Sequence, residues 1–107
     1  MAITAREVFE KRLPERLKTR ADKIANLNTI YQFDITGEAG GQWYLDLSQG
    51  GKITEGTTDA AKCTVTMSAD HFCNLIEGKL SPTMAFMTGK LKVKGDMGLA
   101  LKLGSIL

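Results

Sequence analysis

The sequence predicts a single α+β domain spanning residues 1–107, in which helices cover one face of a five-stranded, mainly antiparallel sheet. Three observations lead to this prediction. A helical hydrophobic period near the start of the chain gives way to a period of two between residues 30 and 67. Three segments in the second half carry helix start and stop signals. A length of 107 residues suits one core of modest size.

The first predicted helix begins at a capping box, in which Glu7 follows Thr4 by three residues. Its apolar residues recur at helical spacing: Val8, Phe9, Leu13 and Leu17. Pro14 lies inside this helix, and its ring clashes with the preceding helical turn. We therefore expect an amphipathic helix that Pro14 kinks or interrupts.

Alternation of apolar and polar residues predicts the strands, since it is typical of strands with one buried face and one solvated face. The strands are expected at five places: 30–35, 43–47, 52–54, 63–67 and 91–93. Gly37, Gly40 and Gly41 separate the first two strands at the distance of a hairpin. The predicted sheet is therefore mainly antiparallel.

Helix signals occur at three places in the second half: 69–77, 82–88 and 96–106. Each of these segments begins at or just after a residue that can cap a helix N-terminus, namely Ser68, Ser81 or Asp96. Gly78 and Gly89 end the first two helices, and Pro82 suits the first helical position.

The composition argues against several kinds of site. One His and two Cys are too few for a His/Cys zinc site, which takes four ligands. Cys63 and Cys73 are ten residues apart, which fits neither a redox pair nor a disulfide framework. His71, at a helix start beside Asp70, is expected to be an exposed polar residue rather than a general base. We expect no enzymatic activity, no metal and no cofactor. The net charge of +2 argues against a nucleic-acid partner.

The two last helices have more apolar surface than one stripe against a sheet requires. The run Met84-Ala85-Phe86-Met87 is apolar on adjacent faces. The last helix carries apolar residues on two arcs: Met97, Ala100 and Leu101 on one, and Leu99, Leu103 and Ile106 on the other. A closed core, a dimer interface or a ligand held between helices and sheet could cover the second face. The residues alone leave these alternatives open.

Three stretches resemble the sterol carrier protein 2 family: 41–47 (GQWYLDL), 61–70 (AKCTVTMSAD) and 78–103. The last stretch has the spacing G-K-x-x-P-x-x-A-F-x-x-G-K-L-K-x-x-G, followed by M-G-L-A-x-K-L, which is long enough to be specific. The resemblance implies a five-stranded sheet covered by about five helices, with a hydrophobic tunnel between them. It also implies binding of sterols, fatty acids, acyl-CoAs or phospholipids. Thr83 and Thr88 depart from the family pattern, which has Gln near this segment.

On this resemblance we expect an intracellular lipid carrier whose cavity is walled by one sheet face and by the last three helices. The expected lining residues are Phe33, Trp43, Leu45, Phe72, Ile76, Met84, Phe86, Met87, Leu99, Leu103 and Ile106. The C-terminal segment 104–107 is expected to act as a lid, because few contacts hold a chain end. The second hypothesis is a non-catalytic module that dimerises through the apolar C-terminal helix.

Two further expectations concern partners and location. Residues 1–23 hold seven bases and four acids, and Lys90, Lys92 and Lys94 follow one another along a strand. These bases favour transient contact with an anionic membrane. The ending Ser105-Ile106-Leu107 lacks the central base of the peroxisomal S-K-L signal, so a cytoplasmic location is expected. We expect a monomer or a weak dimer.

Overall fold

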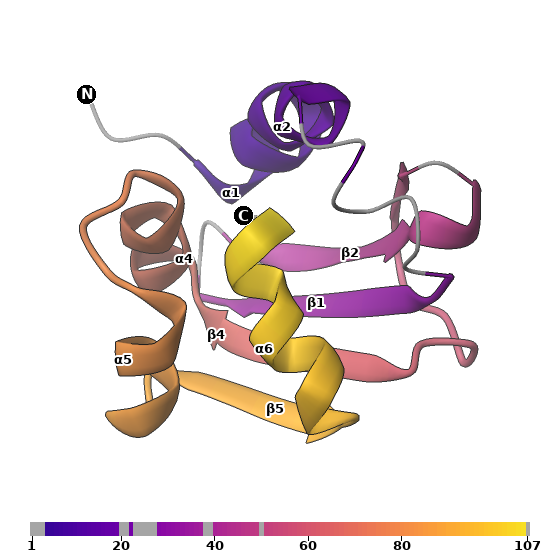
Figure 1. Cartoon of the computed structure of the whole chain (residues 1–107). Helices are drawn as coiled ribbons and strands as arrows, with labels where there is room; N and C mark the ends of the chain where they lie inside the picture. Colours follow the sequence, from indigo (N-terminus) through magenta and orange to yellow (C-terminus); the bar gives the residue numbers. More distant parts are fainter. Residues whose placement is uncertain (1–3, 20–21, 23–27, 38–39, 50, 107) are drawn as a thin grey trace.

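The computed structural model describes residues 4–19, 22, 28–37, 40–49 and 51–106, and for residues 49, 82, 101 and 103–106 it describes the backbone alone. The elements follow one another in this order (Figure 1): α1 Ala5–Glu7, the π-helical turn η1 Val8–Arg12, α2 Leu13–Thr19, β1 Ile30–Thr36, β2 Gly41–Asp46, the 3-10 turn η2 Leu47–Gln49, β3 Lys52–Glu55, β4 Cys63–Ser68, α4 Ala69–Ile76, α5 Pro82–Met87, β5 Leu91–Gly95 and α6 Met97–Ile106.

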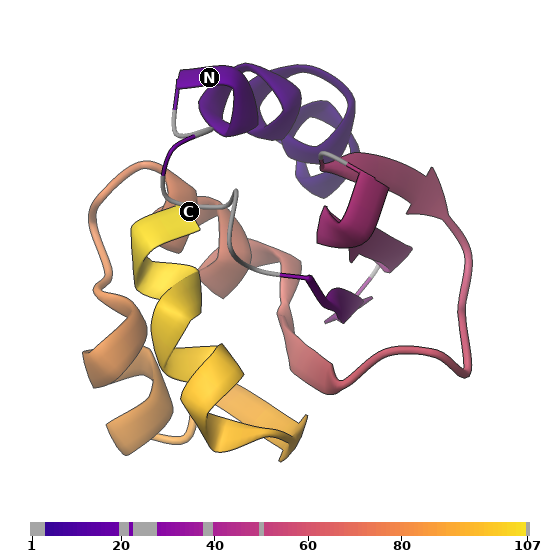
Figure 2. The same ribbon diagram turned by 45° about the vertical axis from the view of Figure 1, so that its right-hand side comes forward.

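The five strands form one sheet in the order β3-β2-β1-β4-β5. Three of the four pairings are antiparallel, and β1 pairs with β4 in parallel. The predicted α+β fold with a mainly antiparallel five-stranded sheet is confirmed. In the described residues the helices number four rather than about five, because α1, η1 and α2 run on as one helix over residues 5–19, here called the first helix. The first helix lies toward β2, whereas α5 lies toward β5 at the other edge of the sheet (Figures 1 and 2).

The first helix changes its hydrogen-bond pattern just before its proline. The Thr4 hydroxyl accepts a hydrogen bond from the Glu7 amide at 3.1 Å, which confirms the predicted cap. Further along, the Leu13 amide donates to the Val8 carbonyl, five residues back, and this bond defines the π-helical turn. Pro14 has no amide hydrogen to donate, so the wider turn falls where the ordinary ladder is already broken. The predicted interruption is therefore a π-helical turn inside a continuous helix.

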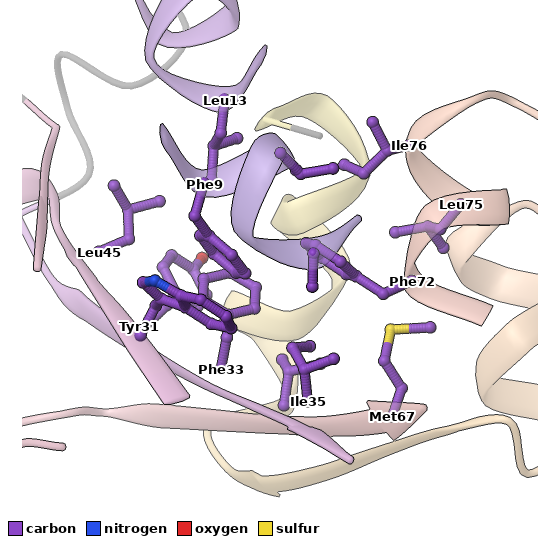
Figure 3. Packing of buried hydrophobic residues seen from close by; sticks show 14 of the residues in the cluster. Phe9, Leu13, Tyr31, Phe33, Ile35, Leu45, Met67, Phe72, Leu75 and Ile76 are labelled. Atoms are coloured by element: carbon purple, nitrogen blue, oxygen red, sulfur yellow. The ribbon is translucent and has the colours of Figure 1, made fainter. Parts of the chain in front are cut away.

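The core lies between the sheet and the helices on one face. Alternate residues of β1, β2 and β4 point toward the helices and are buried: Tyr31, Phe33, Ile35, Trp43, Leu45, Cys63, Val65 and Met67. Phe9 of the first helix enters this layer and stacks on Trp43 with ring centroids 4.5 Å apart and on Phe72 of α4 at 5.1 Å. Figure 3 shows Phe9 above the strand residues Tyr31 and Phe33, with Phe72 beside it. Each such buried side chain contributes roughly 1.5–3 kcal/mol through removal from water.

The opposite face of the sheet is crossed by the connection between β3 and β4. Because β4 pairs with β1 and not with β3, residues 56–62 must pass across β2 and β1. Gln32, which is buried, fastens this connection: its Nε2 donates to the Gly56 carbonyl at 3.2 Å, and its Oε1 accepts from the Thr58 amide at 3.0 Å. This polar side chain thus has partners for its buried amide.

Candidate functional site

The short helix α5 exposes most of its apolar side chains. Its N-terminus is capped by Ser81, whose Oγ accepts from the Met84 amide at 3.0 Å. Ala85 is fully buried, whereas Met84, Phe86 and Met87 are 53%, 42% and 74% exposed. Large apolar patches are rare on protein surfaces, and those that occur often mark sites of interaction. Because α5 buries one small residue and exposes three large apolar ones, it is a candidate for such a site.

The last helix, α6, lies over β4 and β5 beside α5 (Figure 2). Asp96 caps its start, with Oδ1 accepting from the Gly98 amide at 2.8 Å and from the Leu99 amide at 3.2 Å. The Tyr31 hydroxyl donates to the Leu99 carbonyl at 2.6 Å and joins the middle of the sheet to α6. Leu99 and Ala100 are only partly buried, and Met97 is 45% exposed.

Incomplete burial is concentrated in residues 78–102, which we call the open side. Among the described residues, the four large exposed hydrophobic side chains all lie there, on α5 and α6. Five hydrophobic residues pack against the core while staying partly exposed, and four of them are on the open side: Leu80, Val93, Leu99 and Ala100. The helices opposite, residues 5–19 and 69–76, form with the strands beneath them what we call the closed side. Their apolar residues are buried almost completely.

A pocket of about 390 Å³ lies at the outer edge of the closed side, between the first helix and β2 and β3. Its lining residues are Phe9, Glu10, Pro14, Trp43, Gly51, Ile53 and Glu55. Arg6 binds both carboxylates beside it, with Nη2 2.8 Å from Glu55 and Nη1 3.3 Å from Glu10. The hydrogen bonds from Arg6 lower the pKa of Glu55. One base against two acids leaves the mouth of this pocket acidic. Sequence reasoning did not foresee this pocket, because it joins the first helix to β2 and β3, which lie far from that helix in the chain.

The structure divides the expected lining residues into two groups. Five lie in the buried core: Phe33, Trp43, Leu45, Phe72 and Ile76. The rings of Phe33, Trp43 and Phe72 pack against Phe9. Four lie on the open side, where Met84, Phe86 and Met87 are exposed on α5 and Leu99 is half-buried on α6. The side chains of Leu103 and Ile106 are outside the described part of the structure, as is the whole of Leu107.

Sequence reasoning did not include Tyr31, Leu91 and Val93 among the lining residues, although strand alternation placed all three on the apolar face. Leu91 and Val93 pair with Met67 and Val65 of β4, which puts them on the helix-covered face beneath the open side. Tyr31 is buried with its hydroxyl against α6. Alternation was thus a sufficient signal for finding them.

A catalytic or metal site would need nucleophilic or metal-binding side chains that lie together in an accessible place. Burial, with the charge of Asp96 as a smaller cause, raises the pKa of the Cys63 thiol to about 11, and burial also raises the pKa of Tyr31. Such a thiol is a poor nucleophile at neutral pH. Among the described residues, no group of three or more His, Cys, Asp or Glu is placed to hold a metal ion. The described helices include none with the length and hydropathy to cross a membrane.

Comparison with known proteins gives a consistent result. A family model described as the SCP-2 sterol transfer family matches residues 10–107. A hydroxysteroid dehydrogenase-like protein 2 from Bos taurus is 49% identical over 88 residues, which are 80% of this chain and 21% of that protein. This chain therefore spans about a fifth of the length of that relative.

Two solved structures share the fold. Apo sterol carrier protein 2 of Yarrowia lipolytica is 37% identical with a TM-score of 0.72, covering 94% of this chain and 84% of that one. Sterol carrier protein 2 of Aedes aegypti, solved in complex with the C16 fatty acid palmitate, is 26% identical with a TM-score of 0.62, covering 87% and 91% of the two chains.

Proposed function

Because the chain belongs to the SCP-2 sterol transfer family, we propose that it is a lipid carrier that holds an acyl chain or a sterol between the sheet and the helices of the open side. The relative solved with palmitate supports an acyl chain as one such ligand. The observation that carries the proposed location is the incomplete burial of α5, β5 and α6 against an otherwise sealed core.

The open side has the side chains that an adaptable apolar site needs. Methionine is flexible and polarisable, so it fits ligands of different shapes. Met97 lies at the start of α6, and Leu99 and Ala100 are only partly packed against the core. A ligand that inserts between β5 and α6 would bury the parts of Val93, Leu99 and Ala100 that the protein alone leaves accessible.

The pocket under the first helix suits a fatty acid less well. Glu10 and Glu55 stand at its mouth, and Arg6 is already bound to both of them. A third carboxylate brought by a fatty acid would be repelled by this arrangement. The open side, by contrast, has one acid, Asp96, against five lysines: Lys79, Lys90, Lys92, Lys94 and Lys102.

Apolar burial supplies most of the free energy expected for binding an acyl chain. At about 0.8 kcal/mol for each methylene, a C16 chain gains roughly 12 kcal/mol before costs. Association and ordering cost on the order of 4–15 kcal/mol. At the lower end of this cost the net gain is about 8 kcal/mol, which corresponds to a Kd of about 1 μM without a dedicated headgroup contact. We therefore propose selectivity by length and shape rather than by headgroup.

The role proposed for this domain is to hold or present a lipid and not to react it. The curated relatives are named for a dehydrogenase, but the match covers only about a fifth of their length. Within the described residues, the buried Cys63 and the lack of a metal-binding cluster offer no catalytic constellation. Any reaction named for those longer proteins is therefore proposed to belong to their other parts.

Native mass spectrometry of the purified protein, followed by titration with palmitate, tests this function. Two edge-strand variants with matched chemistry test the location: Val93→Asn on β5 and Ile53→Asn on β3, both at partly buried positions. An unpaired amide beside a buried ligand chain weakens binding by about tenfold or more. We expect that loss for Val93→Asn alone.

The outcomes separate the alternatives. Loss of binding in Ile53→Asn alone would place the ligand in the pocket under the first helix, because Ile53 lines that pocket. A protein that carries no lipid and binds neither palmitate nor a sterol would contradict the carrier function. A stable lipid-free dimer would instead support the interaction module.

A further inference from the structure

We propose that the open side docks on anionic membranes through α5, with Met84 and Met87 entering the lipid headgroup region and Lys79 and Lys90 binding lipid phosphates. The purpose of this docking, delivery or uptake of cargo, rests on the proposed function. The docking itself can be measured without any bound lipid.

The apolar part of this surface is one stripe of α5. Met84 and Met87 are three residues apart, so they are neighbours on the same side of the helix. Both are more than half exposed, and Phe86 beside them is 42% exposed. Ala85 is fully buried and fixes the opposite side of the helix against the protein. The stripe therefore points to solvent in the folded chain, and its methionines need no rearrangement to reach a partner.

The charge around α5 has a single sign. Residues 78–95 contain four lysines (Lys79, Lys90, Lys92 and Lys94) and no Asp or Glu. All four are exposed. Lys79 lies just before α5, and Lys90 lies just after it, where its amide donates to the Ala85 carbonyl at 2.9 Å. An exposed apolar stripe flanked by bases is complementary to a membrane that offers apolar depth and negative charge.

The nearest acids do not cancel this charge. Asp96 follows the segment, and its Oδ1 is engaged by the Gly98 and Leu99 amides at the start of α6. Glu77 precedes the segment at the end of α4. Two acids at the boundaries, against four lysines inside, leave the surface net positive.

The first helix, which sequence reasoning named for membrane contact together with Lys90, Lys92 and Lys94, fits this role less well. Its apolar residues are all buried: Ala5, Val8, Phe9, Leu13 and Leu17. Residues 5–19 contain five bases and three acids, and Arg6 is already paired with Glu10 and Glu55. This helix offers a membrane weak charge and no exposed large apolar side chain among the described residues.

Sedimentation with phosphatidylcholine vesicles, with and without phosphatidylserine, tests the proposal. The protein is expected to bind only the anionic vesicles at low salt and to be released by added salt. Each lysine lost from the contact should weaken partitioning roughly fivefold. Lys79→Gln with Lys90→Gln should therefore reduce binding by about twentyfold or more. Met84→Gln with Met87→Gln, at exposed positions that do not support the core, should reduce it by about tenfold.

A matched control removes the same charge from the other side. Lys11→Gln with Lys18→Gln takes two exposed lysines from the first helix and should change binding by less than about threefold. Equal losses from both lysine pairs would overturn the proposal, because binding would then follow net charge alone. A larger loss from the first-helix pair would also overturn it.

Methionine oxidation gives an independent readout of orientation. Exposed methionines are converted by peroxide to sulfoxides, which mass spectrometry locates residue by residue. Anionic vesicles should slow oxidation of Met84 and Met87 by about fivefold or more, in line with burial of both side chains. Oxidation of both at an unchanged rate while the protein sediments with vesicles would overturn the proposal. A dimer that forms without lipid and dissociates in the Met84→Gln with Met87→Gln variant would overturn it too.

The failure of docking and the failure of the carrier function can be told apart. A protein that binds palmitate and ignores anionic vesicles overturns the docking surface and leaves the carrier. A protein that binds vesicles through α5 and takes up no lipid supports the docking surface and contradicts the carrier.

Discussion

The closed side and the open side cover the same sheet, yet they are built differently. On the closed side, Phe9 is stacked between Trp43 and Phe72, and the apolar residues of the first helix and α4 are buried. On the open side, α5 fully buries only Ala85 among its described side chains, and α6 is joined to the sheet by the hydroxyl of Tyr31. The closed side can carry the stability of the fold, which leaves the open side for the proposed ligand.

The difference originates in the sequence of the helices. The first helix has one apolar stripe, so burying that stripe leaves a polar exterior. The segments that form α5 and α6 are apolar on more than one side, so packing one side against the sheet leaves the others exposed. Within the described part of the chain, no further layer covers them. The uncovered surface is where the proposed ligand and membrane contacts lie.

Replacing a phenylalanine on each side gives the largest expected contrast. Phe9→Ala removes the centre of the aromatic stack and should lower the free energy of unfolding by about 3–5 kcal/mol. Phe86→Ala, at a position 42% exposed, should lower it by about 1 kcal/mol or less. Urea denaturation of both variants checks this. Similar losses in the two would contradict a difference in packing between the sides.

Alkaline pH tests whether the sheet beneath α6 is dry. Burial raises the pKa of Cys63 from 9.0 to about 11. The stability linked to the neutral thiol is therefore fully present below pH 9 and is lost as the pH rises through 11. We expect a fall on the order of 2 kcal/mol across this window in urea denaturation.

Cys63→Ala is the control for the alkaline fall. It should make the decline between pH 9 and 11 clearly shallower, with Tyr31 contributing part of the remainder because its pKa is raised by the same burial. An unchanged decline in this variant would show that the thiol is not the titrating group, and that the sheet under α6 is wetter than the structure indicates.

Removing the hydroxyl of Tyr31 tests how much its hydrogen bond contributes to holding α6 against the sheet. Tyr31→Phe keeps the buried ring and removes the hydrogen bond to the Leu99 carbonyl, at a cost of about 1 kcal/mol. Amide hydrogen exchange should become faster in α6, with no change in α4. Exchange that stays the same in both helices would mean that packing, and not this bond, holds α6 in place.

The smallest effect is expected from the ion pair on the closed side. Hydrogen bonds from Arg6 lower the pKa of Glu55, so the stability they add is present above pH 4.5 and is lost as the pH falls through the lowered value. Both side chains are 55% exposed, and Glu55→Gln should change urea denaturation at pH 7 barely beyond error. A large loss would show that the first helix depends on this pair more than on Phe9.

The strands and helices could be predicted from local patterns. Alternation placed Tyr31 with Phe33 on one face of their strand and Leu91 with Val93 on one face of theirs. Capping residues located the helix starts at Ser81 and Asp96. These features depend on neighbours in the chain, so one sequence is enough to reveal them. The parallel pairing of β1 with β4 depends on the path of residues 56–62 across the sheet, which no local pattern encodes.

The candidate site was harder to predict, because core residues and cavity-lining residues have the same hydrophobic pattern in the sequence. Trp43 and Phe72 were expected at the cavity, but Phe9 fills the space between them. Met84 and Met87 were expected at the cavity too, and they face solvent on α5. The sequence identified which residues are apolar, whereas the contact partners came from the tertiary structure.

Hydrogen exchange with and without bound palmitate tests the central claim, that the open side is where lipid is held. We predict slower exchange on binding in β5 and α6, with the first helix and α4 unchanged. This pattern follows from a ligand that completes the packing of the open side over a core that is already sealed. Protection confined to the first helix and β3 would place the lipid in the pocket beside Glu55 and would contradict the claim.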